Sequence, residues 1–109
     1  MVEQGDIIYI DFDPQLGTEQ AGYRPALVVS TKGFQNFTLK RAMLCPITST
    51  NRGYPAHIPL DSRTITRGVI MCDQLKTLDL SVRHFKYVEK APEDIVSSAI
   101  DLIAEFLGL

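Results

Sequence analysis

The sequence predicts a mainly β protein, in which a small, strongly curved antiparallel sheet or partial barrel carries one helix at its C-terminal end. Two observations support this prediction. Short apolar runs recur between residues 7 and 88, and turns rich in glycine and proline separate them. After residue 91 the apolar residues instead recur every three or four positions, which is the period of an amphipathic helix.

The expected strands follow one another at short intervals. Their ranges are 7–12, 26–30, 42–48, 56–60, 68–75 and 85–88. Pro46 removes a backbone donor, so its part of the third strand is expected at an edge or a bulge. Between the last two strands, residues 78–83 are expected to make one helical turn.

The C-terminal helix has both a start and a stop signal. Pro92 suits a first helical position, and Glu93 and Asp94 complement the helix dipole. The apolar stripe consists of Ile95, Ala99, Leu102, Ile103 and Phe106. Gly108 is expected to end the helix.

Length and composition indicate an ordinary globular protein. The 109 residues are expected to form one domain, and 45% hydrophobic with 22% charged residues disfavours disorder. No apolar run approaches the ~18 residues of a membrane span, and the start MVEQGD lacks the features of a signal peptide. We therefore expect a cytoplasmic protein with no membrane partner, in which Cys45 and Cys72 are two buried, reduced thiols.

Charge is unevenly distributed along the chain, although the net charge is only −2. Residues 1–13 and 91–109 each hold four acids and no base. Residues 14–90 hold all eleven Lys and Arg residues against five acids, a formal charge of +6. Such segregation can give an acidic protein a positive face, which mildly favours a nucleic-acid ligand.

Common catalytic motifs are absent from the sequence. It contains no GxGxxG, P-loop, GxSxG or HExxH motif, which removes the common nucleotide, hydrolase and zinc interpretations. Asp11 and Asp13 form an isolated D-x-D, which fits a strand-end turn better than a cation site. His57 and His84 have no carboxylate or cysteine nearby in sequence and are interpreted as packed or surface histidines. We expect neither a metal nor another cofactor.

Polar side chains instead gather at three strand ends. Because Pro25 disfavours helical angles in the preceding residue, the loop GTEQAGYRP holds Arg24 extended at the mouth of a strand. The three sets are Glu19, Tyr23 and Arg24; Thr48, Ser49, Thr50 and Arg52; and Asp73, Gln74 and Lys76. If the curved sheet brings these ends together, they line a groove of arginine, hydroxyls and amides that suits a phosphodiester.

The same segments resemble the MazF/PemK (Kid) family of toxin endoribonucleases. The resemblance rests, in order, on GDII (5–8), DFDP (11–14), GTEQAGYRPALVVS (17–30), PITS (46–49), GYP (53–55) and GVIMCDQLKTLD (68–79). It covers roughly residues 5 to 107, and E-Q-x-G-x-R-P is its most specific part. It implies an SH3-like barrel of the CcdB/PemK type, a homodimer, cleavage of single-stranded RNA, and inhibition by a cognate antitoxin protein.

The resemblance also implies roles for particular residues. The family cleaves RNA without metal and leaves a 2′,3′-cyclic phosphate and a 5′-hydroxyl. Arg24 matches the catalytic arginine that clamps the phosphate, and Thr48 matches the catalytic threonine. Glu19 matches an acidic groove residue, which leaves open whether it is the general base or orients that base.

One departure from the family pattern concerns Asp73. In the PemK (Kid) branch an arginine two positions earlier works with this aspartate, and here that position is Met71. Asp73 is therefore expected to be structural or to contact the substrate. The remaining expected RNA contacts are Gln20, Tyr23, Ser49, Arg52, Tyr54, Gln74 and Lys76. For Tyr54, a packed turn tyrosine fits the sequence equally well.

Two other functions remain open at this point. A non-catalytic toxin of the same fold, similar to CcdB, would bind and poison DNA gyrase, and a third alternative is an inert nucleic-acid-binding module. The pairing of the E-Q-x-G-x-R-P loop with P-I-T favours the nuclease, because a gyrase poison has no use for a buttressed arginine facing a hydroxyl. The recognised RNA sequence does not follow from these residues.

Overall fold

The computed structural model describes residues 1–12 and 22–109. The elements of these residues are, in chain order, β1 (Asp6–Asp11), β2 (Tyr23–Val28), α1 (Lys32–Phe37), β3 (Arg41–Thr48), β4 (His57–Pro59), β5 (Val69–Met71), the 3-10 helix η1 (Cys72–Gln74), β6 (Lys76–Asp79), β7 (Phe85–Lys90) and α2 (Glu93–Phe106). Neither α-helix in the described part of the chain is long and apolar enough to cross a membrane.

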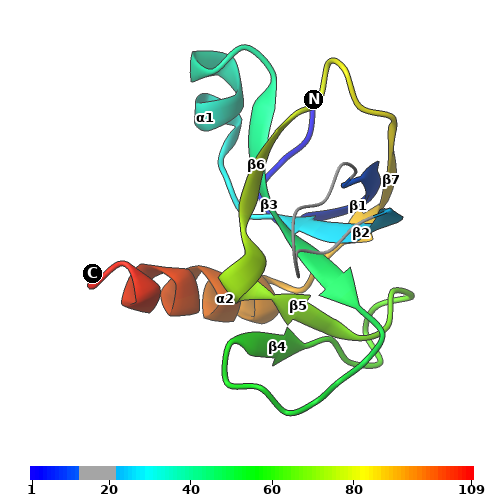
Figure 1. Ribbon diagram of the computed structural model, residues 1–109, viewed down its shortest axis with the longest axis vertical. Coiled ribbons are helices and arrows are strands. Elements are labelled where there is room, and N and C mark those ends of the chain that lie inside the picture. Colours follow the sequence, from blue (N-terminus) through cyan, green and yellow to red (C-terminus); the bar gives the residue numbers. More distant parts are fainter. Residues whose placement is uncertain (13–21) are drawn as a thin grey trace.

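Strand β3 joins the two parts of an antiparallel sheet (Figure 1). The strand order is β4-β5-β3-β2-β1-β7, and β6 also pairs with β3. On one side of β3, residues 41–44 pair with β6 and residues 47–48 pair with β5. Because β4 and β7 stand at the ends of this order, the described strands form an open, curved sheet rather than a closed barrel. This confirms the predicted fold class.

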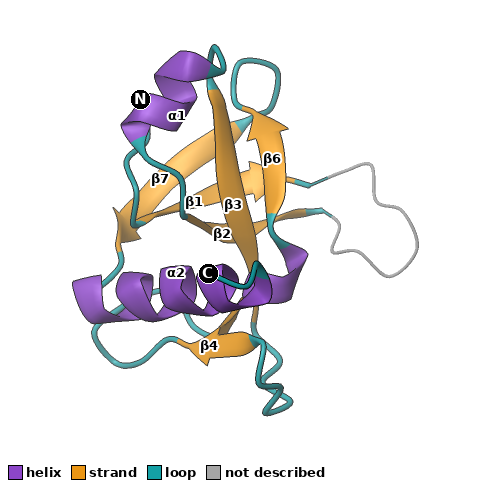
Figure 2. Cartoon of the chain, turned by 90° about the vertical axis from the view of Figure 1, so that its left-hand side faces the viewer, coloured by secondary structure: helices purple, strands orange, loops and turns teal. Residues whose placement is uncertain are grey.

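Two hydrophobic cores lie on the two faces of the sheet. Along β2, Ala26 and Val28 belong to one core and Leu27 to the other, which is the period of two expected of a strand buried on both faces. Helix α2 covers the second core with Ile95 and Ala99. In Figure 2, α2 crosses the sheet between its long strands and β4.

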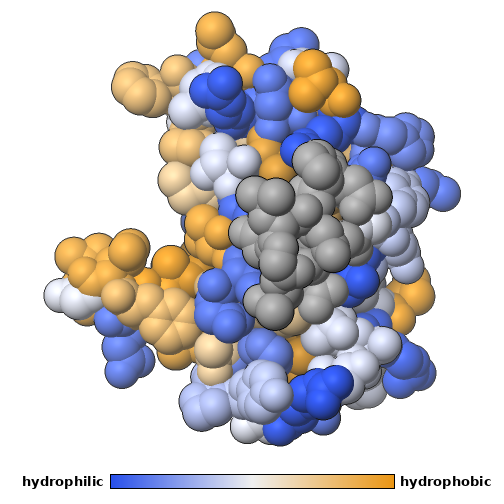
Figure 3. Space-filling view, viewed as in Figure 1, coloured by the Kyte–Doolittle hydropathy of each residue, from blue (hydrophilic) through white to orange (hydrophobic). Residues whose placement is uncertain are grey.

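The helix agrees with the prediction except at its end. It spans residues 93–106, with Pro92 as the N-cap, and Gly108 follows with a φ of 77°. Phe106 was assigned to the buried stripe, but it is 49% exposed. The last turn of α2 projects beyond the sheet and forms the apolar protrusion at the left of Figure 3, so no core lies beneath Phe106.

Three local predictions were wrong. Helix α1 was not expected; it begins after Thr31, whose hydroxyl accepts a hydrogen bond from the Phe34 amide (3.3 Å). The predicted strand 68–75 ends at residue 71, because the chain turns into η1, where the Cys72 amide donates to the carbonyl of Ala56 (3.1 Å). The predicted helical turn over 78–83 is wrong because residues 76–79 form strand β6.

Two sequence signals for β3 and the thiols are confirmed. Pro46 faces Ala26 on one side of β3, and on the other side it lies between the residues that pair with β6 and those that pair with β5. It therefore stands at a local edge, as its missing donor requires. Cys45 and Cys72 are both buried and free.

Candidate functional site

Two cavities flank the end of β3. Ile47 and Ser49 line one of them, with a volume of about 430 Å³, and Thr48 and Thr50 line the other, of about 300 Å³. This division follows from the alternation of side chains along an extended chain. Residues 47–50 thus form a ridge between the two cavities.

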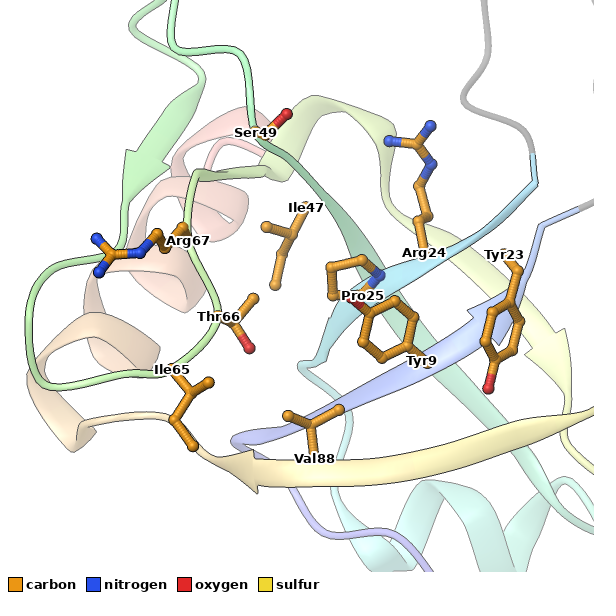
Figure 4. Close-up of a pocket in the computed structure, with 10 residues that line it drawn as sticks. All are labelled: Tyr9, Tyr23, Arg24, Pro25, Ile47, Ser49, Ile65, Thr66, Arg67 and Val88. Carbon is orange, nitrogen blue, oxygen red and sulfur yellow. The ribbon is translucent and has the colours of Figure 1, made fainter.

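The larger cavity, here called the tyrosine pocket, is drawn in Figure 4. Its walls come from four strands and a loop. The lining residues are Tyr9, Tyr23, Arg24, Pro25, Ile47, Ser49, Ile65, Thr66, Arg67 and Val88. Tyr9 and Tyr23 lie side by side on one wall, and Ile65 and Thr66 lie across the cavity from them. The described lining contains two guanidinium groups and no carboxylate.

An aromatic stack forms one wall of the tyrosine pocket. The rings of Tyr9 and Tyr23 have centroids 5.3 Å apart and are inclined by 27°, and those of Tyr23 and His84 are 5.6 Å apart and inclined by 26°. Tyr9 faces outward because its neighbours Ile8 and Ile10 are buried in the core. Tyr9 and Tyr23 remain 38% and 48% exposed. The sheet therefore presents π-faces to solvent.

The opposite wall belongs to the loop of residues 61–67, which the carboxylate of Glu89 holds. This carboxylate accepts hydrogen bonds from the amides of Ile65 (3.0 Å) and Thr66 (2.8 Å) and from the Thr66 hydroxyl (2.7 Å). Partial burial acts to raise the pKa of Glu89, but these bonds outweigh it and lower that pKa. The loop is thereby fixed to strand β7.

Arg63 fixes the same loop to helix α2. Its guanidinium lies 2.8 Å from the carboxylates of both Asp61 and Asp94. The hydrogen bonds from Arg63 lower the pKa of Asp61 from an ordinary value of 3.8 to about 2, and they also lower the pKa of Asp94. Because these groups are exposed, the network orders the loop more than it stabilises the whole fold.

The smaller cavity, here called the histidine pocket, has a mixed lining. Its residues are Thr48, Thr50, Arg52, Tyr54, His57, Met71, Asp73 and Gln74. Nε2 of His57 lies 3.5 Å from Oδ1 of Asp73, and the side chain of His57 is only 8% exposed whereas that of Asp73 is 49% exposed. The His57 ring also lies 5.2 Å from the Tyr54 ring, with an interplanar angle of 55°. A buried imidazole thus lies beside an exposed carboxylate here.

Strand alternation puts Arg24 and Thr48 on one face of the sheet. The last residues of β2 and β3 that pair with each other are Ala26 and Pro46, after which residues 47–48 of β3 pair with β5. Arg24 lies two residues from Ala26, and Thr48 lies two residues from Pro46. Both side chains then belong to the sheet face that also carries Ala26 and Ala42. Arg24 is half-buried and lines the tyrosine pocket, while Thr48 lines the histidine pocket. The two side chains therefore line different cavities, one on each side of the ridge.

Gly68 explains how close the ridge lies to strand β5. It has a φ of 121°, and a Cβ at this position would lie 2.0 Å from the carbonyl oxygen of Thr48. A Cβ and a carbonyl oxygen cannot approach so closely, and the left-handed φ of this residue itself favours glycine. Gly68 therefore allows the packing that sets the positions of Thr48 and Ser49.

The predicted site residues divide between the two pockets. Tyr23, Arg24 and Ser49 line the tyrosine pocket, and Thr48, Arg52, Tyr54, Asp73 and Gln74 line the histidine pocket. Lys76 lies on β6 and lines neither. Glu19 and Gln20 lie outside the described residues. Tyr54 is 53% exposed, so it is not the packed turn tyrosine that the sequence allowed.

The lining residues that sequence reasoning missed include Tyr9, His57, Thr66 and Arg67. The alternation of residues 7–12 could have identified Tyr9, because Tyr9 is the polar-tipped residue between two buried isoleucines. His57 had no such signal, since Asp73 comes close only through the pairing of β4 with β5. Within residues 1–12 and 22–109, no three His, Cys, Asp or Glu side chains cluster as metal ligands would.

Residues 3–107 match the family described as PemK-like, MazF-like toxins of type II toxin-antitoxin systems. The endoribonuclease PemK of Escherichia coli is 34% identical over 110 residues, covering 97% of this chain and 82% of the relative. The crystal structure of MazF from Deinococcus radiodurans superposes with a TM-score of 0.92 at 31% identity, covering 99% of this chain and 97% of that one. A chain of a MazE-MazF crystal structure from the same organism superposes with a TM-score of 0.85 at 31% identity, covering 99% of this chain and 96% of that one.

Proposed function

The chain belongs to the family of PemK-like, MazF-like toxins of type II toxin-antitoxin systems, and we propose that it is an endoribonuclease that cleaves single-stranded RNA and so inhibits translation. The observation that carries the proposal is that Arg24 and Thr48, which the family resemblance gives as catalytic, lie on one face of the sheet by strand alternation and line the two pockets on either side of the ridge. Arginine and a hydroxyl on one face of a sheet are suited to one phosphate.

The proposed reaction is a transesterification followed by release. The 2′-oxygen of the ribose loses its proton and forms a bond to the adjacent phosphorus, while the bond from phosphorus to the 5′-oxygen breaks. The leaving oxygen takes up a proton, so the products are a 2′,3′-cyclic phosphate and a 5′-hydroxyl. This chemistry needs a base, an acid and donors for the phosphoryl oxygens, but no redox group.

The roles are those that the family resemblance implies, and they agree with the chemistry of the residue types. Arg24 clamps the phosphate through two parallel hydrogen bonds and stabilises the charge of the transition state. The Thr48 hydroxyl, which accepts a hydrogen bond from the Thr50 amide (3.3 Å), donates to the same phosphate. Glu19, which lies outside the described residues, serves as the base or orients it.

The remaining lining residues bind the RNA on either side of the ridge. Ser49 and Tyr23 lie on the side of the tyrosine pocket, and Arg52, Tyr54 and Gln74 on the other side. Lys76 and Gln20 are proposed to extend these contacts along the strand. Asp73 has Met71 where a partner arginine would stand, and it faces His57, so we assign it a structural or substrate-contacting role.

Two protein partners belong to the proposal. The family description names a toxin-antitoxin system, and a MazE-MazF structure superposes on this chain, so we propose that a cognate antitoxin binds and inhibits it. We also propose a homodimer. Sedimentation equilibrium at micromolar concentration tests the dimer, and a monomer under these conditions would contradict it.

The activity is tested directly with labelled single-stranded RNA in the presence of EDTA. Discrete cleavage products are expected from the wild-type protein, and the same sequence made as DNA should remain intact because it lacks the 2′-hydroxyl. Binding without cleavage would instead indicate an inert RNA-binding module. Inhibition of DNA gyrase without any effect on RNA would indicate the CcdB-like alternative.

A further inference from the structure

We propose that the tyrosine pocket is a subsite for one unstacked nucleobase of the RNA, with Tyr9 as its stacking platform and Arg67 at its rim as a contact for the backbone of the same nucleotide. This inference rests on the proposed function, since it assumes that RNA lies across the ridge. It assigns roles to Tyr9 and Arg67, two residues that the sequence signature of the family does not include.

The aromatic wall provides the first step. Tyr9 and Tyr23 come from neighbouring strands, stack at 5.3 Å and stay 38% and 48% exposed. Tyr9 and Pro25 are directly opposite in the strand register, so Tyr9 and Tyr23 are diagonal neighbours on one face of the sheet. Single-stranded nucleic acid is held by such faces, and one stacked base contributes about 1–3 kcal/mol.

The composition of the lining provides the second step. Beside the rings it offers the hydroxyls of Ser49 and Thr66, which can pair with a base edge, and two guanidinium groups. No carboxylate lines the cavity among the described residues, and the nearby carboxylate of Glu89 is engaged by the amides of Ile65 and Thr66. A flat aromatic ligand with polar edges and a nearby negative charge fits this lining, and a nucleotide has all three features.

The wall across the cavity is already ordered before any ligand binds. Glu89 and Arg63 hold the loop of residues 61–67 at both ends through the hydrogen bonds described above. On this fixed loop Ile65 is 83% exposed, and the Arg67 side chain points away from the tyrosines (Figure 4). Because the loop is ordered, a base can enter without the entropy loss of closing a mobile segment.

The position of the pocket relative to the ridge provides the third step. Pro25 and Ser49 line the pocket, and they are the chain neighbours of Arg24 and Thr48. A phosphate held by Arg24 and Thr48 would therefore have its adjoining nucleoside at the mouth of the pocket. We infer that this base directly flanks the scissile phosphate and contributes to sequence preference.

The test uses a map of cleavage sites on a long RNA of mixed sequence, together with binding of labelled single-stranded RNA. Tyr9→Leu should relax the preference at one position beside the cut and weaken binding about tenfold, whereas Tyr9→Phe should behave as wild type. Arg67→Ala should lower cleavage at all sites alike and reduce the salt slope of binding by about one.

Two matched control variants and a check of folding accompany these measurements. Tyr87→Leu and Arg41→Ala replace exposed residues outside both pockets, and both should leave map and binding unchanged. Melting temperatures identify any variant that fails to fold, in which case Tyr9→His serves as the second variant. If Tyr9→Leu shows a wild-type cleavage map and wild-type RNA binding, the subsite is refuted. The same result is expected if a protein segment, and not a base, occupies the tyrosine pocket. Failure of the wild-type protein to cut RNA refutes the proposed function, and the binding measurements then still decide the subsite.

Discussion

The two pockets beside the end of β3 differ in what they can do to a phosphodiester. The tyrosine pocket combines exposed rings with Arg24 and Arg67 and has no carboxylate in its described lining. The histidine pocket instead pairs a buried imidazole with the open carboxylate of Asp73. One short ridge therefore separates an aromatic and cationic surface from a surface that carries an imidazole and a carboxylate.

The difference also has a structural origin. The tyrosine pocket is assembled from elements distant in sequence, and the hydrogen bonds of Glu89 and Arg63 hold its loop. The histidine pocket is built mostly from residues 48–57 and η1. Only the ridge is common to both, so changes on the ridge should affect catalysis most and changes within one pocket should have partial effects.

The largest expected effect comes from Arg24→Lys. Lysine keeps the charge but loses the planar fork, so cleavage should fall by roughly 10² or more, which is typical of losing one preorganised donor to the transition state. RNA binding should weaken far less, and the melting temperature should barely change. Single-turnover kinetics and anisotropy measure these quantities. Cleavage near the wild-type rate would show that Arg24 is only a solvated residue of the strand end.

Gly68→Ala tests whether the ridge is held in place by close packing. The added Cβ meets the Thr48 carbonyl, and the positive φ adds strain of order 1–3 kcal/mol, so the free energy of unfolding should fall by at least about that amount. Cleavage should fall as well. Gly53→Ala is the matched control, because Gly53 has a φ of 70° with open space around it. Equal losses in both variants by urea denaturation would contradict the packing role.

Thr48→Val tests the hydroxyl on the ridge. The substitution keeps the shape of the side chain and removes one neutral hydrogen bond to the phosphate, so kcat should fall about tenfold. Thr50→Val, in the same pocket, should change kcat much less. If the two variants lose activity equally, Thr48 has no special role.

His57→Phe tests the histidine pocket in this comparison. The 3.5 Å contact between His57 and the half-exposed carboxylate of Asp73 is of a kind that contributes about 0.2–1 kcal/mol, so cleavage should fall by less than about fivefold. Single-turnover kinetics measure this loss. A loss comparable to that of Arg24→Lys would move the main catalytic role into the histidine pocket.

The smallest expected effect concerns pH and the loop of residues 61–67. The pKa of Asp61 is lowered from 3.8 to about 2 by Arg63, so its stabilising contribution is complete above about pH 4 and is lost as the pH falls through 2. Hydrogen exchange should show the Arg63 amide, which donates to Asp61 (3.0 Å), losing protection over this range, and the Ile65 amide losing protection when Glu89 is protonated, both before the Leu27 amide does. Loss of protection in all three at the same pH would indicate global unfolding instead.

The sequence predicted the architecture well because the signals were local. The terminal helix, the strand with Pro46 and the buried thiols depend on periods and on single-residue chemistry. Strand β6 was missed even though Leu78 and Leu80 alternate with polar residues, because a short alternating run also fits a helical turn. Helix α1 was missed because its six residues include glycine and show no helical period.

The site could be predicted only in part. The family resemblance proposed Arg24 and Thr48, and strand alternation puts them on one face of the sheet. The division into two pockets could not be predicted, because it depends on which of residues 47–50 faces which side of the ridge. The contact between His57 and Asp73 comes from the pairing of β4 with β5, which no spacing in the sequence indicates.

The chemistry of the RNA ends tests the central claim most directly. Wild-type protein is incubated with a single-stranded RNA in EDTA, and mass spectrometry identifies the new termini. The proposed reaction at Arg24 and Thr48 predicts fragments with a 2′,3′-cyclic phosphate on one side of each cut and a 5′-hydroxyl on the other. Fragments with 5′-phosphates, or cleavage only after magnesium is restored, would contradict the account.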